Sequence, residues 1–174
     1  MKYNNMHNTI QKTMQATIVN IFAVAAMMTS LSVNAEEGAI RFSNKAFKQV
    51  ITKAADGTVS VDYVEPELVL PKDVILYEIQ FENISDQPVD DIVINNPIAN
   101  NSAYREVSAT DDVAEVTFSV DGKTFAPAGS LTVTDSNGRT WQAKPEDYTA
   151  IRWTYKGSLQ PGEKGKLSYK TVIK

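Results

Sequence analysis

The chain has 174 residues, a formal net charge of −4 at pH 7 and no cysteine. The lack of cysteine excludes a disulfide framework, a thiolate metal site and a thiol nucleophile. The acidic balance disfavours nucleic acid and anionic lipid as partners, because both require a basic face.

Residues 1–35 have the features of a secretory leader. Two lysines precede an apolar run over residues 16–31, and Val33-Asn34-Ala35 offers the small residues that a signal peptidase accepts. A retained membrane anchor is the alternative, but the run contains Asn20, lacks a basic flank after it and is shorter than the roughly 20 residues that span a bilayer. We therefore expect an exported, periplasmic or extracellular product without a segment inserted in the membrane.

Cleavage after Ala35 would leave 174 − 35 = 139 residues, with a net charge of 15 − 21 = −6 because two lysines are lost. This length is typical of one domain and is sufficient to form a core without disulfides. We predict a single domain over residues 36–174.

The mature part alternates between apolar and polar residues with the period of a β-strand. The clearest case is residues 73–82, where Ile75, Tyr77, Ile79 and Phe81 point one way and polar residues the other, which predicts a central strand. The same alternation recurs at Val59-Val61-Tyr63, Ile92-Ile94, Ala114-Val116-Phe118-Val120, Ile151-Trp153-Tyr155 and Leu167-Tyr169.

Turn-forming residues separate these strands, as at Asp56-Gly57, Asp121-Gly122 and Gln160-Pro161-Gly162. No mature segment sustains an amphipathic helical pattern over three turns. The nearest, residues 44–55, contains Phe47–Thr52, which reads equally well as an edge strand. The pattern predicts an all-β fold, an antiparallel sandwich of about eight strands.

The order of motifs over residues 68–174 resembles a known bacterial family. Pro71 and Asp73 precede a strand carrying Tyr77, Phe81-Glu82-Asn83 leads into a polar turn, and Leu159-Gln160-Pro161-Gly162 leads into the final strand. This order is similar to the conserved-repeat domain of bacterial surface and exported proteins known as domain of unknown function eleven, present here in one copy. The resemblance implies an immunoglobulin-like β-sandwich and assigns no catalytic residue.

The single histidine, His7, lies in the leader. The mature part therefore has no imidazole for Ser-His-Asp or Cys-His catalysis or for a histidine-ligated metal. Catalysis by a pair of carboxylates, as in glycosidases, is not excluded by the lack of histidine and cysteine, but no motif singles out such a pair. We expect a protein that is not an enzyme, with no catalytic, cofactor-binding or metal residues and no cofactor.

Three oxygen-rich segments have residue types that bind Ca²⁺. None has the spacing of a calcium-binding loop, so we interpret each as a solvated turn and keep calcium as the alternative. They are Asp111-Asp112 with Glu115, Asp86 with Asp90-Asp91, and Asp135-Ser136-Asn137.

Aromatic and amide side chains suggest two further surfaces. Trp141, Trp153, Tyr148 and Tyr155 are candidates for a sugar-stacking platform, although Trp153 and Tyr155 share a strand face with Ile151 and are expected in the core, whereas Trp141 is expected to be exposed. Amides around Pro97 predict a long connection, with a binding loop at one end of the sandwich as the alternative to ordinary loop chemistry; they are Asn95, Asn96, Asn100 and Asn101.

The last strand, Gly165–Ile173, carries Lys166 and Lys170 and is flanked by Lys164 and Lys174. We interpret these lysines as protection of an exposed strand against edge pairing. Donation of the strand to a neighbour is the competing interpretation.

The first functional hypothesis is a structural or protein-interaction role in the cell envelope or outside the cell, with another envelope or surface protein as partner. Binding of carbohydrate or another envelope ligand is the second, and assembly by strand exchange is the third. An exposed Trp141 beside another aromatic ring would favour the second, and an unpaired sheet edge of matching length would favour the third.

Overall fold

The computed structural model describes residues 38–110 and 112–174. The predicted leader and Asp111 lie outside the described residues. The described part is all-β, with ten strands and one short 3₁₀ helix, η2 (Pro145–Asp147). None of its helices has the length and apolar character to cross a membrane.

The strands form three antiparallel sheets. The order is β2-β1-β3-β10-β5 in the five-stranded sheet, β4-β9-β6 in the three-stranded sheet and β7-β8 in a separate hairpin. The strands are β1 (Ile40–Lys53), β2 (Val59–Val64), β3 (Val74–Asn83), β4 (Val93–Pro97), β5 (Ser102–Tyr104), β6 (Ala114–Ser119), β7 (Thr132–Thr134), β8 (Thr140–Gln142), β9 (Ala150–Tyr155) and β10 (Lys164–Ile173).

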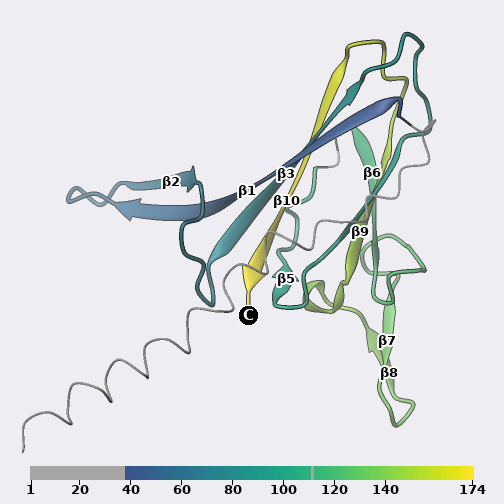
Figure 1. Ribbon diagram of the computed structural model, residues 1–174. Helices are drawn as coiled ribbons and strands as arrows, with labels where there is room; N and C mark the ends of the chain where they lie inside the picture. Colours follow the sequence, from purple (N-terminus) through teal and green to yellow (C-terminus); the bar gives the residue numbers. More distant parts are fainter. Residues whose placement is uncertain (1–37, 111) are drawn as a thin grey trace, which may run out of the picture.

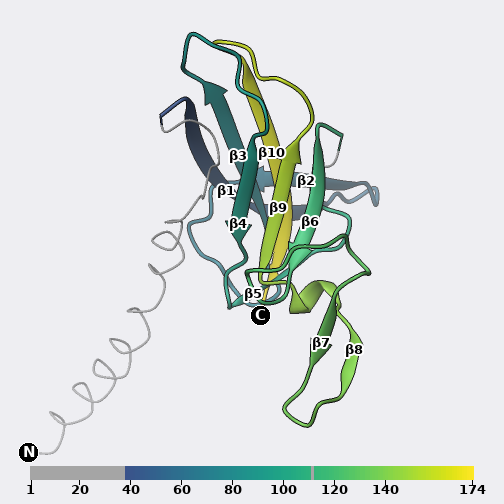
Figure 2. The same cartoon turned by 90° about the vertical axis from the view of Figure 1, so that its right-hand side faces the viewer.

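The three-stranded sheet lies over one face of the five-stranded sheet, and the core fills the space between them (Figures 1 and 2). Rings make several of the contacts across this space: the ring centroids of Trp153 and Tyr169 are 5.8 Å apart, and those of Phe81 and Tyr155 are 5.4 Å apart. The Trp153 indole N–H donates to the carbonyl of Thr110 at 3.1 Å, so its one polar atom is satisfied in the core. The sandwich predicted from alternation is confirmed.

The central strand predicted over residues 73–82 is β3. Its predicted inward side chains, Ile75, Tyr77, Ile79 and Phe81, are all buried. Burial of a large apolar side chain contributes about 1.5–3 kcal/mol, so this strand alone anchors much of one side of the core.

Two segments differ from the sequence-based expectation. Phe47–Thr52 is part of the longer, fourteen-residue β1, which pairs with β3 up to Lys48 and with β2 from Lys48 onward, so that residues 49–52 alone have a single partner strand. Asn95 and Asn96 lie in β4 rather than in a loop. The Asn95 side-chain oxygen accepts from the Arg152 Nε–H of β9 at 2.6 Å, and Asn96 donates to the Tyr169 hydroxyl of β10 at 2.6 Å, so both amides serve strand contacts.

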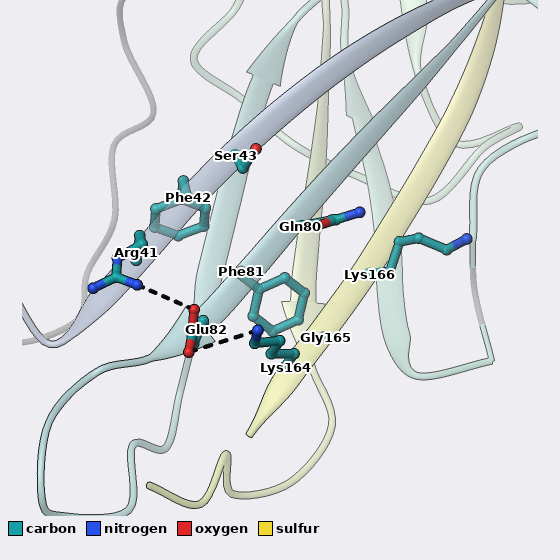
Figure 3. A pocket seen from close by; sticks show the side chains of 9 residues that line it. All are labelled: Arg41, Phe42, Ser43, Gln80, Phe81, Glu82, Lys164, Gly165 and Lys166. Atoms are coloured by element: carbon teal, nitrogen blue, oxygen red, sulfur yellow. Dashed lines mark hydrogen bonds and ion pairs between the residues drawn. The ribbon is translucent and has the colours of Figure 1, made fainter. Parts of the chain in front are cut away.

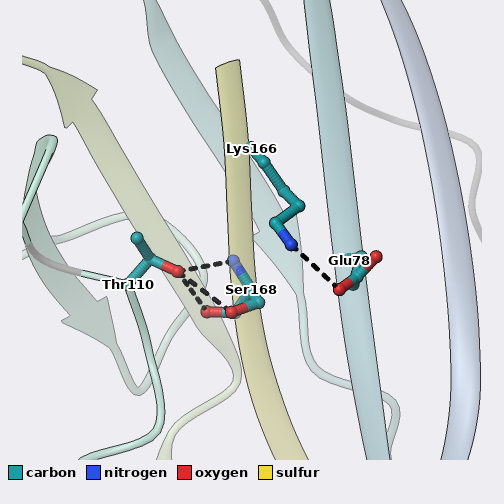
Figure 4. Close-up of polar contacts among 4 residues, drawn as sticks. All are labelled: Glu78, Thr110, Lys166 and Ser168. Carbon is teal, nitrogen blue, oxygen red and sulfur yellow. Dashed lines mark hydrogen bonds and ion pairs between the residues drawn. The ribbon is translucent and has the colours of Figure 1, made fainter. Parts of the chain in front are cut away.

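β10 is not the exposed edge that its lysines suggested, because it lies between β3 and β5. Beyond β5, the hydroxyls of the 105–110 loop take the place of a neighbouring strand. The Ser168 N–H donates to Thr110 Oγ1 at 2.8 Å, as Figure 4 shows, and the Lys170 N–H donates to Ser108 Oγ at 3.0 Å. On the other side, Lys166 pairs with Glu78 of β3 at 3.3 Å.

β1 is longer than the body of the sandwich. Its pairing with β3 extends from Ile40 opposite Asn83 to Lys48 opposite Ile75, and its pairing with β2 starts at Lys48 opposite Val64. Residues 49–64, which we call the arm, therefore continue past β3 as a hairpin that projects from one side of the molecule (Figure 1). The turn at Asp56-Gly57, predicted from sequence, forms the tip of the arm.

Candidate interaction surface

The arm exposes large apolar side chains. All six residues of β2 are exposed, and the exposed fractions are 63% for Ile51, 58% for Val59, 49% for Val61 and 37% for Tyr63. Scattered apolar side chains are common on protein surfaces, but neighbouring ones on one element mark an interaction site.

The register of the hairpin places these side chains on one face. Ile51 stands directly opposite Val61, and Tyr63 stands opposite Gln49 on the same side. Residues directly opposite each other share a face, and every second residue of a strand does too. Ile51, Val59, Val61 and Tyr63 therefore form what we call the apolar face of the arm.

The outer edge of β2 is unpaired, because β2 is the last strand of its sheet. The Ala54 N–H donates to the carbonyl of Thr58 at 2.8 Å, which fixes the positions of the hydrogen-bonded pairs in the hairpin. Since these pairs alternate along an antiparallel ladder, Ser60, Asp62 and Val64 direct their backbone groups toward β1. The backbone N–H and C=O groups of Val59, Val61 and Tyr63 face outward.

This edge lacks the usual protection against strand pairing. Proteins protect edges with lysine, proline, a bulge, a covering loop or a very short strand. The sequence of β2, VSVDYV, contains neither lysine nor proline, and Asp62 is its single charge. The opposite edge of the same sheet is β5, which has three residues. Of these two edge strands, β2 is the longer, and it offers three outward residues for strand addition.

Polar contacts fix the base of the arm to the body. Lys48 forms an ion pair with Asp73 at 2.7 Å and donates to the carbonyl of Leu68 at 3.2 Å. The hydrogen bonds from Lys48 and from the Leu70 backbone hold the pKa of Asp73 below its ordinary value. The Lys170 ammonium lies 5.1 Å from the centre of the Tyr63 ring. The arm is thus held at its root and exposed toward its tip.

The outer face of the five-stranded sheet is basic. Arg41, Glu82 and Lys164 are direct cross-strand neighbours, and Glu82 lies 3.4 Å from Arg41 and 3.8 Å from Lys164 at a shallow hollow (Figure 3). Over the residues that β1, β3 and β10 pair with one another, this face has a net charge of 5 − 2 = +3, from Arg41, Lys45, Lys164, Lys166 and Lys170 against Glu78 and Glu82. The net charge of the whole chain, −4, therefore does not describe this face.

A second hollow lies between the 105–110 loop, β6 and η2. Its floor contains Tyr104, Phe118 and Tyr148, whose ring centroids are 4.6–6.0 Å apart. Each of these rings is buried. They pack on one another and do not offer free faces to a ligand.

The four aromatic residues considered for sugar stacking do not come together. Trp141 on β8 is 42% exposed, as predicted, whereas Trp153 and Tyr148 are buried. Tyr155 packs edge-on against Phe81 in the core. Among the ring contacts of the described residues, none involves Trp141. Trp141 is therefore a single exposed ring on the β7–β8 hairpin.

The acidic segment Asp135-Ser136-Asn137 forms a turn held by its own backbone. Asp135 accepts from the N–H groups of Asn137 and Arg139 and pairs with the Arg139 guanidinium at 2.8 Å. Across the described residues, no three carboxylates or histidines lie close enough together to hold a metal ion. Asp111, which belongs to one of the candidate segments, is outside the described residues.

The arm was not identified as a site from the sequence. The alternation at Val59-Val61-Tyr63 predicts a strand, and β2 confirms it, but alternation does not reveal whether a second layer covers the apolar side. One sequence feature sets this strand apart from the others: it precedes residue 68, where the resemblance to the bacterial family begins. Comparison of the chain with protein-family models, with curated proteins and with solved structures finds no match.

Proposed function

We propose that this protein is a non-enzymatic interaction module of the cell envelope or extracellular space, and that it binds another protein by adding a strand to the outer edge of β2. The observation that carries the proposal is the outer edge of β2. All six residues of β2 are exposed, and Val59, Val61 and Tyr63 present both outward backbone groups and apolar side chains.

Strand addition uses both features of the edge. Backbone hydrogen bonds provide affinity, and the side chains on alternate positions provide selectivity. On β2 the same residues, Val59, Val61 and Tyr63, supply outward backbone groups and apolar contact area. The salt bridge of Lys48 and the packing of Tyr63 under Lys170 hold the strand extended before a partner arrives, which lowers the entropic cost of binding.

Two further arguments support a location outside the cytoplasm. The predicted leader over residues 1–35 supports export, and the resemblance over residues 68–174 is to a domain of exported and surface proteins. Carbohydrate binding has less support, because Trp141 has no aromatic neighbour with which to form a platform.

Site-specific photo-crosslinking in the producing cells tests the proposal. A photoreactive residue replaces Val61, and a matched control replaces Thr140, which is exposed on β8. We expect a discrete protein adduct from position 61 and none from position 140. If position 61 gives no adduct, or the same adducts as position 140, the proposed binding edge is wrong.

A further inference from the structure

We infer that the strand added to β2 is β2 of a second copy of this chain, in an antiparallel arrangement with a two-fold axis at Val61. This inference rests on the proposed function and identifies its partner. It follows from the arrangement of outward backbone groups, apolar side chains and charge along β2.

Three antiparallel registers of two such edges pair at least two outward residues of each copy. With Val61 opposite Val61 of the second copy, Val59 and Tyr63 are also paired, so all three outward residues of each copy take part. Shifting the axis to Ser60 leaves Tyr63 without a partner. Shifting it to Asp62 leaves Val59 without a partner and sets two aspartates directly opposite each other, which is destabilising.

The register centred on Val61 matches side chains as well as backbone. Val59 stands opposite Tyr63 of the second copy, so apolar residues meet apolar residues. Because Ile51 is the cross-strand neighbour of Val61, the two arms would form a continuous row of four aliphatic side chains, two isoleucines outside two valines. On the other face Asp62 stands opposite Ser60, a neutral residue, and the two aspartates are kept apart.

The size of the contact determines its strength. Each of the three outward pairs exchanges two backbone hydrogen bonds, but two six-residue strands bury less than the roughly 1,200–2,000 Å² of a stable protein interface. The pairing is therefore reversible and concentration dependent. Isologous pairing of two edges also leaves no free β2 edge, so the assembly closes at a dimer.

Cysteine crosslinking tests the register, because the chain has no cysteine of its own. Val61→Cys places two thiols in a hydrogen-bonded pair whose Cα atoms are about 5.5 Å apart, within the span of a disulfide. Val59→Cys is the matched control on the same face. In this register the two introduced thiols are four residues out of step, about 13 Å along the strands, which is too far to bridge.

We expect purified Val61→Cys protein to form a disulfide-linked dimer under mild oxidation at least about tenfold faster than Val59→Cys. A mixture of Val59→Cys and Tyr63→Cys proteins should form the mixed dimer, because these positions face each other. Equal rates for Val61→Cys and Val59→Cys, or no mixed dimer, would overturn the register.

Two charge variants test the dimer without an added thiol. Val61→Lys brings two ammonium groups together at the axis, and we expect the dimer dissociation constant from sedimentation to rise about tenfold or more. Ser60→Lys adds the same charge on the other face, opposite Asp62 of the second copy. We expect this variant to associate about two- to thirtyfold more tightly, through two new cross-strand ion pairs.

The outcomes separate this inference from the proposed function. Suppose that the purified protein stays monomeric at every concentration, while position 61 gives an adduct with a different protein in cells. The inference that the partner is a second copy is then wrong, but the proposal that β2 is a binding edge stands. A purified dimer that is unaffected by Val61→Lys places the contact elsewhere and overturns the inference.

Discussion

The Phe81 ring occupies the space in which a side chain at position 165 would lie. Gly165 of β10 stands directly opposite Phe81 of β3, and a Cβ built on Gly165 would come within 2.0 Å of the ring. Phe81 is only 1% exposed and packs edge-on against Tyr155 of the other sheet. The glycine is therefore required by packing between two strands.

Gly165→Ala should destabilise the protein by about 1–3 kcal/mol, because the added methyl group forces the buried ring of Phe81 out of its position. Chemical denaturation measures the free energy of unfolding. A change below about 0.5 kcal/mol would contradict the close packing described here.

Phe81→Ala should cost about 3–5 kcal/mol, because it removes one of the largest fully buried side chains. The double variant Phe81→Ala/Gly165→Ala serves as its control. Without the ring the new methyl group meets no obstacle, so the double variant should be more stable than the sum of the two single effects predicts. Strict additivity would show that the two residues do not compete for space.

Asn96→Ala should cost about 1–3 kcal/mol, since the buried Tyr169 hydroxyl loses its amide partner at 2.6 Å. The measurement is again chemical denaturation, repeated in a Tyr169→Phe background that has no hydroxyl to satisfy. We expect the cost of Asn96→Ala to fall in that background. An equal cost in both would mean that this hydrogen bond between the sheets contributes little.

Alkaline pH should unfold the protein through its buried tyrosines. Burial raises the pKa of both Tyr77 and Tyr169 above the ordinary value of 10.0. Since their neutral forms are favoured in the folded state, their contribution to stability is complete below pH 10 and declines as the pH rises further. Ultraviolet titration should show two tyrosines that ionise only together with loss of the fold; their ionisation in the folded state would contradict this prediction.

Acid should weaken the base of the arm. The pKa of Asp73 is held below its ordinary value of 3.8, so its contribution is complete above that value and is lost as the pH falls toward the depressed pKa. Asp73→Asn should cost about 1 kcal/mol at neutral pH, with the difference from wild type shrinking below about pH 4. A difference that does not change with pH would mean that the carboxylate charge is unimportant there.

The sequence predicted the core better than the surface. The alternation at Ile75 to Phe81 correctly indicated the buried face of β3, because four large apolar side chains at every second position need a covering layer. The same period at Val59 to Tyr63 correctly predicted a strand, but not that its apolar side is exposed, since the register puts this side on the outer face of the sheet, opposite the face that the three-stranded sheet covers.

Short strands and strand neighbours were less predictable. β5, β7 and β8 have three residues each, too few for a period to emerge. The lysines of β10 suggested an edge, yet the hydroxyls of Ser108 and Thr110 cover that side of the strand. Ser108 bonds to Lys170, 62 residues further along the chain, and Thr110 bonds to Ser168, 58 residues further along. Such long-range pairing has no local sequence pattern.

The continuity of β1 from body to arm has a mechanical consequence. A pulling force applied to the arm would travel along β1 and load its nine residue pairs with β3 in parallel, so that they shear together instead of opening one after another. An attachment made through this arm would therefore resist tension more strongly than one made through the separate β7–β8 hairpin.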